Sequence, residues 1–138
     1  QDSRIADIGT DHGFVPICLA KEGRIKSALA MDVRTGPLER AEAHIKEAGI
    51  SDIPISTRLS DGLKELKPQE ADTVIIAGMG GELEIKILQE EGIYGARSGV
   101  LSFRLSQILK RYAASFQKRG FSLKKRPCSG RKENTIRL

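Results

Sequence analysis

Short apolar runs alternate with amphipathic stretches through the first 90 residues, and this alternation constrains the fold more than any other feature of the chain. The apolar runs have the length of strands, and the stretches between them have Pro near their start or apolar residues at helical spacing. The predicted strands are Arg4–Ile8, Ser27–Asp32, Pro54–Leu59 and Thr73–Ala77, and the predicted helices are Val15–Glu22, Pro37–Ala48 and Gly81–Glu91. Repeated βα units predict an α/β fold, a Rossmann-like parallel sheet with flanking helices.

Charge divides the chain into two parts of different composition. Residues 1–99 carry 12 basic and 17 acidic side chains, whereas residues 100–138 carry 11 basic side chains and one acidic one. A chain of 138 residues has room for one domain. We therefore expect residues 1–99 to form the folded core and residues 100–138 to be a basic segment outside it.

Other properties of the whole sequence indicate a cytoplasmic protein. Cys18 and Cys128 form neither a close pair nor a disulfide framework, which is typical of a reduced compartment. No apolar stretch approaches the roughly 20 residues that a membrane span needs, and no signal peptide is recognisable. We expect no membrane association and no metal site, since no metal-binding motif is present. The sequence leaves the oligomeric state open.

The first predicted strand runs into a loop with two glycines and a preceding acid. Gly9 lets a ligand approach the backbone, and Gly13 eases the turn into the helix. The nicotinamide fingerprint Gly-x-Gly-x-x-Gly is absent, and the carboxylate of Asp7 would repel a phosphate. This carboxylate can instead accept a hydrogen bond from an ammonium group, as in the amino-acid part of S-adenosylmethionine. As an isolated motif, the loop is equally compatible with a purely structural turn.

Acidic residues also end the next two predicted strands. Asp32 follows Asp7 by 25 residues, at the place where an acid can accept hydrogen bonds from both ribose hydroxyls. Asp61 can accept a hydrogen bond from an adenine amino group, and Gly62 lets the chain pass close to the ring. Taken singly, each aspartate is also a common helix cap or turn residue. Acids at three successive strand ends predict one cofactor site.

The fourth predicted strand ends in Ala77-Gly78-Met79-Gly80-Gly81, and a flat substrate base can lie on such a run. Methyltransferases acting on amino groups commonly carry an Asn/Asp-Pro-Pro-aromatic loop here, and this chain does not. Adenine N1 has its own lone pair and needs no proton removed, so an enzyme acting on it can work by alignment and proximity. The alternative is a flexible turn without function.

Four segments together resemble the bacterial tRNA (adenine-N1)-methyltransferase family, class I enzymes that use S-adenosylmethionine and modify position 22 in the D-arm. They are Ala6–Pro16 (ADIGTDHGFVP), Met31–Pro37 (MDVRTGP), Arg58–Leu63 (RLSDGL) and Ala71–Leu83 (ADTVIIAGMGGEL). The resemblance covers about residues 4–90. Its Asp-His pair and Ala-Gly-Met-Gly-Gly string are more specific than the general methyltransferase motifs.

The resemblance implies S-adenosylmethionine as cofactor, tRNA as partner and methyl transfer to adenine N1. The implied cofactor residues are Asp7, Gly9, Asp32, Asp61, Gly62 and Ala77, and the implied residues facing the base are Asp11, His12, Phe14, Gly78, Met79 and Gly80. The family usually has Tyr at the position of Phe14, so stacking on a base is retained without a hydroxyl. Asp11 and His12 are the candidate catalytic pair, in which His12 orients the base or moves a proton. The alternative is that Asp11 simply holds His12 as a hydrogen-bonding scaffold residue.

Two other functions fit the same residues. One is methylation of a small molecule, and the other is a non-catalytic cofactor-binding fragment with a basic RNA-binding tail. N1-methyladenosine formed on tRNA separates the first hypothesis from both.

The residues after Gln89 do not resemble the family, and two hypotheses explain them. In the first, the chain is truncated at both ends and its reading frame shifts between Gln89 and Ser98. A two-nucleotide shift within Leu101–Ser115 permits Val-Leu-Ser-Pro-Gln-Ser-Asp-Ile-Glu-Glu-Val-Arg-Arg-Phe-Leu, which resembles a family strand, loop and helix. In the second, Leu105–Phe116 is a true amphipathic helix with a basic face toward RNA.

The frameshift hypothesis also predicts an incomplete fold. The sheet would stop at Thr73–Ala77 and leave an open edge on its C-terminal side, and much of Arg97–Leu138 would be disordered. We then expect the chain to be a poor or inactive enzyme.

Overall fold

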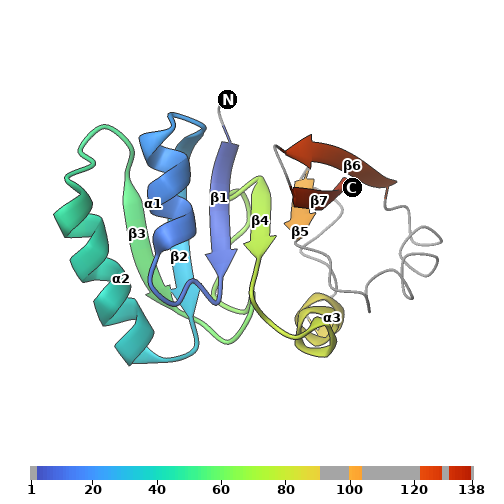
Figure 1. Cartoon of the computed structure of the whole chain (residues 1–138). Helices are drawn as coiled ribbons and strands as arrows, with labels where there is room; N and C mark the ends of the chain where they lie inside the picture. The colour runs from blue at the N-terminus through green and yellow to red at the C-terminus, as the bar shows by residue number, and fades with distance from the viewer. Residues whose placement is uncertain (1–2, 91–99, 104–121, 129–130, 138) are drawn as a thin grey trace.

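The computed structural model describes residues 3–90, 100–103, 122–128 and 131–137, which form one seven-stranded sheet with helices against it (Figure 1). The strand order is β3-β2-β1-β4-β5-β7-β6. The elements in chain order are β1 (Ser3–Ile8), α1 (Phe14–Lys21), β2 (Ile25–Asp32), α2 (Thr35–Ala48), β3 (Ile55–Leu59), β4 (Thr73–Ile76), α3 (Gly81–Glu90), β5 (Val100–Phe103), β6 (Ser122–Cys128) and β7 (Arg131–Arg137).

The four strands and three helices predicted within the first 90 residues are all confirmed, with bounds that differ by at most two residues. The first four strands pair in parallel, with β1 between β2 and β4 and with β3 outside β2. The inner strands β1, β2 and β4 are largely apolar, and β1 and β2 have buried residues on both faces, whereas the edge strand β3 has the sequence Ile-Ser-Thr-Arg-Leu and no buried residue. The Rossmann-like parallel arrangement is therefore confirmed for this part of the chain.

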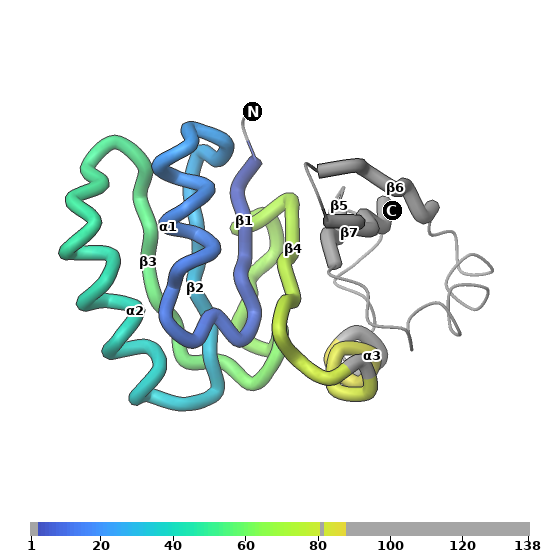
Figure 2. The backbone as a smooth tube through the Cα atoms, in the orientation of Figure 1, coloured from blue at the N-terminus to red at the C-terminus, as the bar shows by residue number. Residues whose placement is uncertain are grey.

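Alternate residues of the strands supply two apolar cores, one on each face of the sheet. On one face Ile5 and Ala28 pack with Ala20 of α1, and α1 and α2 lie side by side over this face (Figure 2). On the other face Ile8 and Met31 belong to a second cluster. Its members are Ala6, Ile8, Leu29, Met31, Leu63, Leu66, Ala71, Val74, Ile76, Ile85 and Ile87. The second cluster therefore joins α3 and the segment between β3 and β4 to the sheet.

Gly13 allows α1 and α2 to approach closely at the start of α1. Its φ of 72° is a conformation that side chains disfavour. A Cβ at this position would lie 3.1 Å from the Cβ of Ala41 in α2. The glycine therefore brings α2 against the loop that follows β1.

The expectation of an open edge beyond β4 is wrong for the described residues. β5 pairs in parallel with β4, β7 pairs antiparallel with β5, and β6 forms the outer edge. Strand pairing is made by backbone N–H and C=O groups, and β5, which pairs with the edge of β4, is the uncharged segment Val-Leu-Ser-Phe. Pro127 lies in β6, and an edge strand is where a sheet tolerates proline.

Part of the predicted C-terminal segment cannot be compared with the structure. The predicted helix Leu105–Phe116 lies outside the described residues, and so do residues 91–99, which include most of the proposed frame break. The frame shift itself stays a hypothesis about the gene, and resequencing the gene tests it.

Candidate active site

The carboxyl ends of β1, β2, β3 and β4 meet at one edge of the sheet, the lower edge in Figure 1. In the strand registers Ile8 pairs with Met31 on one side and Ile76 on the other, and Asp32 pairs with Leu59. The loops after these strands contain most of the predicted site residues. In open parallel sheets ligands bind at this edge, because the strand order reverses there and leaves a crevice.

Asp7 is a buried carboxyl group at the end of β1. Its residue is 2% exposed, and the Thr10 hydroxyl donates a hydrogen bond of 2.7 Å to its Oδ2. Burial raises the pKa of Asp7 from 3.8 to about 6, the Thr10 hydrogen bond opposes the rise, and nearby Asp32 adds to it. An ionised Asp7 therefore lacks a cationic partner among the described residues, and a ligand with an ammonium group would supply one.

Asp32 is held rigidly by the backbone of two loops. Its Oδ1 accepts a hydrogen bond of 3.0 Å from the Arg34 N–H, and its Oδ2 accepts one of 3.3 Å from the Asp11 N–H. Asp11 has a φ of 51°, which is costly for a residue with a side chain. Each carboxylate oxygen keeps a further lone pair, so Asp32 is oriented and can still accept hydrogen bonds from a diol.

Gly9 and Met79 are in direct contact across the site. Gly9 has a φ of 69°, and a Cβ there would lie 2.0 Å from the Met79 Cε. Met79 also packs against the apolar cluster of the sheet. The structure thus brings the loops after β1 and β4 together, with the Met79 side chain lying on the backbone of Gly9.

The loop after β3 reaches the same edge. The Ser60 N–H donates to the Asp32 backbone oxygen at 2.8 Å, and Gly62 has a φ of 64° beside Ile87. Asp61 is exposed and forms an ion pair with Lys64, and this hydrogen-bonded contact lowers the pKa of Asp61. Asp61 therefore lies at the edge as an ionised acceptor that faces solvent.

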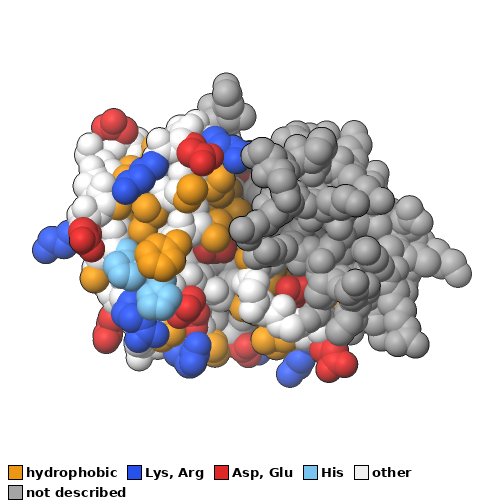
Figure 3. Space-filling view, viewed as in Figure 1, with side chains coloured by type: hydrophobic (Ala, Val, Ile, Leu, Met, Phe, Trp, Pro, Cys, Tyr) orange, Lys and Arg blue, Asp and Glu red, His pale blue; other side chains and the backbone are white. Residues whose placement is uncertain are grey.

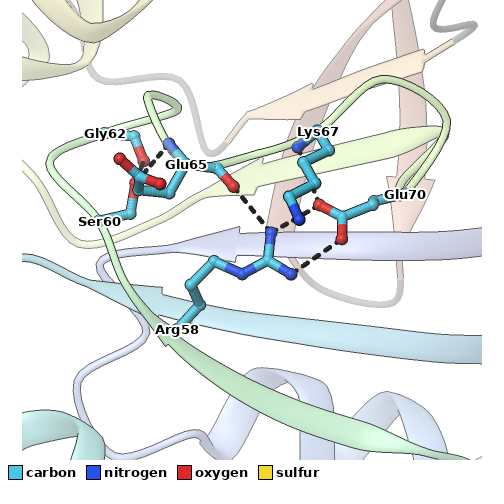
Figure 4. A network of polar contacts seen from close by, with 6 residues as sticks. All are labelled: Arg58, Ser60, Gly62, Glu65, Lys67 and Glu70. Carbon is cyan, nitrogen blue, oxygen red and sulfur yellow. Dashed lines mark hydrogen bonds and ion pairs between the residues drawn. The ribbon is translucent and has the colours of Figure 1, made fainter.

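Arg58 and Glu70 tie the two ends of the loop between β3 and β4 together (Figure 4). The Arg58 guanidinium donates to both carboxylate oxygens of Glu70, at 2.6 and 2.8 Å, and to the Glu65 backbone oxygen at 2.7 Å. The Lys67 N–H donates to Glu70 as well. This two-pronged arrangement is a strong form of ion pair, and it holds the loop that carries Asp61.

Replacing Arg58 with Met should lower the free energy of unfolding by about 1 kcal/mol at pH 7, because the pair is lost from a partly exposed site. The Arg58 contact lowers the pKa of Glu70 to about 2. A lowered carboxyl pKa stabilises the fold above pH 4.5, and this stabilisation is lost as the pH falls toward 2. In urea denaturation, the difference between wild type and Arg58→Met should therefore narrow from pH 5 to pH 3.

Lys26→Met, on the exposed part of β2, is the matched control for this experiment. Its unfolding energy should stay within about 0.5 kcal/mol of wild type at both pH values. A difference at Arg58 that does not change with pH would contradict the role assigned to the ion pair.

The loop after β4 leaves open space beside Gly78 and Gly80. A Cβ at either glycine would meet nothing within 4 Å, and Gly78 has a φ of 76°. Ala77 is half-buried at the end of β4, next in sequence to Ile76, which pairs with Ile8. A flat ligand can therefore approach the backbone of this loop from outside.

The candidate pair Asp11 and His12 is brought together loosely. The Asp11 Oδ2 lies 3.5 Å from the His12 Nε2, and the Arg40 Nη2 lies 3.8 Å from the Asp11 Oδ1. The His12 Nδ1 is buried and has no hydrogen-bond partner. The His12 ring is stacked on Phe14, which is 61% exposed. These residues extend the site from Asp32 toward the start of α1.

Sequence reasoning missed several residues at this edge. Thr10 and Ser60 are buried polar residues. The Thr10 hydroxyl donates to Asp7, and the Ser60 hydroxyl donates to the Gly62 backbone oxygen. Their position in the sequence, close to predicted site residues, could have indicated them. Val33 and Leu59 are 59% and 51% exposed although both are apolar. Val33 follows Asp32 in sequence, and Leu59 pairs with Asp32 in the sheet. An apolar surface therefore lies beside the carboxylate, and a flat ring can cover that surface.

Among the described residues, no group of three or more His, Cys, Asp or Glu side chains is arranged to hold a metal ion. None of the helices in that part of the chain has the length and apolar character needed to cross a membrane.

Comparison with known proteins identifies several relatives. A tRNA (adenine(22)-N(1))-methyltransferase from Bacillus subtilis is 38% identical over 85 residues, which span 62% of this chain and 35% of the relative. The chain thus matches about a third of that protein's length. Sp1610 of Streptococcus pneumoniae, solved with S-adenosyl-L-methionine, has a TM-score of 0.83 and 28% identity, over 100% of this chain and 67% of that one. M. capricolum TrmK, solved with S-adenosyl-homocysteine, has a TM-score of 0.74 and 26% identity, over 99% and 62%.

The family described as "Methyltransferase domain" matches residues 1–123, most of the chain and all of the sheet edge described above. The parallel sheet, the acids at successive strand ends and the glycine loops agree with this match. The chain belongs to the methyltransferase-domain family.

Proposed function

We propose that this chain binds S-adenosylmethionine and that its protein transfers the methyl group to N1 of an adenine in the D-arm of tRNA. The observation that carries the cofactor proposal is the buried Asp7 carboxyl with its raised pKa, beside the oriented carboxylate of Asp32. The relative named tRNA (adenine(22)-N(1))-methyltransferase supports the choice of substrate.

Three parts of the cofactor have a matching acid at the sheet edge. Asp7 accepts a hydrogen bond from the ammonium group, Asp32 accepts hydrogen bonds from the ribose hydroxyls, and Asp61 accepts one from the adenine amino group. Gly9, Gly62 and Ala77 line the ligand from the loops after β1, β3 and β4, with the Met79 side chain lying on Gly9. The exposed apolar side chains of Val33 and Leu59 support this assignment, since a purine ring covering them removes apolar surface from water.

The substrate side of the site is formed by the loop after β4 and the start of α1. When bound, S-adenosylmethionine supplies a methyl group on a positively charged sulfur, open to attack by a lone pair. Gly78, Met79 and Gly80 support the target base, and Phe14 stacks on it. Asp11 and His12 orient it, so these residues act chiefly by alignment, because adenine N1 needs no general base.

The remaining assignments concern the whole chain. We place the complete cofactor site within residues 1–99 and assign to residues 100–138, with 11 basic side chains and one acidic one, a general attraction to RNA. We place the protein in the cytoplasm, with tRNA as its partner. The lack of a disulfide framework supports this location.

Isothermal calorimetry tests the cofactor proposal. S-adenosylmethionine and S-adenosylhomocysteine should each bind with one site per chain, and NAD should give no heat of binding. Binding of NAD without a response to either sulfur compound would overturn the proposal.

Incubation with unmodified tRNA and S-adenosylmethionine tests the reaction. N1-methyladenosine in the D-arm, detected by mass spectrometry after digestion, is the expected product of the frame-restored protein. Cofactor binding without this product would contradict the tRNA assignment and favour a small-molecule substrate or a non-catalytic binding role. Methylation by the 138-residue chain itself would show that its C-terminal segment suffices for activity.

A further inference from the structure

Three aromatic rings meet at the surface beside the candidate site: His12 lies in the loop after β1, Phe14 at the start of α1 and His44 in α2. The Phe14 ring lies 5.4 Å from His12 and 4.9 Å from His44, with interplanar angles of 12° and 18°. The two histidine rings are 5.5 Å apart. Figure 3 shows the two histidines and a neighbouring hydrophobic ring together on the face of the molecule, near Lys and Arg side chains.

His44 has a defined orientation and protonation pattern. Its Nδ1 lies 2.9 Å from the His12 backbone oxygen. A carbonyl oxygen only accepts, so Nδ1 carries the hydrogen and donates it. The ring of His44 is therefore held against Phe14 by a hydrogen bond to the loop that carries His12, and the close approach of α2 at Gly13 makes this contact possible.

The surroundings of the three rings are suited to an anion. Arg34 is 73% and Arg40 51% exposed, and each makes a long ion pair, at 3.9 Å to Asp32 and 3.8 Å to Asp11. Phe14 itself is 61% exposed, which leaves an apolar ring in water. A partner with both a flat ring and a negative charge matches this combination, and a nucleotide has both.

We propose that His44 extends the Phe14 ring, which stacks on the target adenine, into a wider stacking surface that also takes a neighbouring unpaired base of RNA, with Arg34 and Arg40 near its phosphates. The proposal rests on the function proposed above and extends it to α2, where His44 supplies a ring that no motif indicated. Stacking on nearly parallel rings tolerates any base, so this surface contributes affinity rather than sequence preference.

Two substitutions separate the ring of His44 from its hydrogen bond. His44→Asn removes the ring and keeps an N–H near the position of Nδ1, whereas His44→Phe keeps a ring and removes the donor. Affinity for pentaadenylate, measured by fluorescence anisotropy at one salt concentration, should fall about fivefold or more in His44→Asn. It should stay within about twofold of wild type in His44→Phe. Both variants should bind S-adenosylhomocysteine as wild type does.

Proton NMR gives a direct view of the stacking, because the chain has two histidines. A base over the rings should shift the signals of the His44 ring upfield when pentaadenylate is added. Inorganic tripolyphosphate is the control for charge, since it competes for basic side chains and has no ring. Tripolyphosphate should change the chemical shifts of the His44 ring only slightly.

The proposal is overturned if His44→Asn binds pentaadenylate like wild type, if both variants lose affinity equally, or if pentaadenylate leaves the His44 signals unmoved. Each of these results is compatible with normal binding of S-adenosylhomocysteine, so the function proposed above would stand. Failure of wild type to bind S-adenosylhomocysteine would instead contradict that function.

Discussion

Asp7→Asn should stabilise the ligand-free protein by about 1–3 kcal/mol at pH 8 and weaken binding of S-adenosylhomocysteine about tenfold or more. The stability gain follows from removing a buried charge, because Asp7 is 2% exposed and, within the described part of the chain, the Thr10 hydroxyl is its one side-chain donor. The loss of binding follows from the same change, because the amide is a weaker acceptor for an ammonium group.

The gain in stability should depend on pH. Burial raises the pKa of Asp7 from 3.8 to about 6, so its contribution to stability is fully present below pH 3.8 and is lost as the pH rises through 6. The side chain introduced by Asp7→Asn does not titrate, so the difference in unfolding free energy between Asp7→Asn and wild type should vanish near pH 4 in chemical denaturation. Asp61→Asn, at an exposed acid of the same edge, is the control, and its free energy of unfolding at pH 8 should stay close to that of wild type. An advantage of Asp7→Asn that persists unchanged at pH 4 would contradict the burial argument.

Asp32→Ala should weaken binding of S-adenosylhomocysteine by about 1–3 kcal/mol, or roughly 5- to 150-fold. The substitution removes the acceptor for the ribose hydroxyls and also leaves the N–H groups of Asp11 and Arg34 without their partner. Asp32→Asn keeps one oxygen and should have an intermediate affinity. Calorimetry measures both.

Asp52→Ala is the matched control for this series, because Asp52 is an exposed acid in the turn between α2 and β3. Its affinity should equal that of wild type. If Asp32→Ala binds as tightly as Asp52→Ala, the ribose is held elsewhere and the assignment of Asp32 is wrong.

The first four strands could be predicted within two residues because a buried parallel strand leaves a strong local signal, a run of apolar residues that ends in Gly or Asp. The meeting of Asp7, Asp32 and Asp61 at one edge followed from topology alone, since parallel strands with helical connections place their carboxyl ends together. These features depend on residues that are close in sequence.

Other features depend on contacts between distant residues, and no local pattern indicates them. The Met79 side chain lies on Gly9, and Arg58 binds Glu70 across a loop. His44 in α2 donates a hydrogen bond to the His12 carbonyl in the loop after β1. The strands β5, β6 and β7 were missed for a different reason. We inferred disorder from the excess of basic side chains, whereas strand pairing is made by the backbone.

The backbone of Asp11 connects the Asp32 carboxylate with the surface formed by His12, Phe14 and His44. Its N–H binds Asp32, and its side chain lies near His12 and Arg40, while its φ of 51° leaves the loop under strain. A ligand that donates hydrogen bonds to the Asp32 carboxylate therefore affects the hydrogen bond from the Asp11 N–H that holds this loop. The same loop carries His12 and accepts the hydrogen bond of His44, and so holds the rings that we propose to stack on RNA. Thermodynamic linkage requires such an influence to be mutual, so cofactor and RNA should each alter the other's affinity by the same factor.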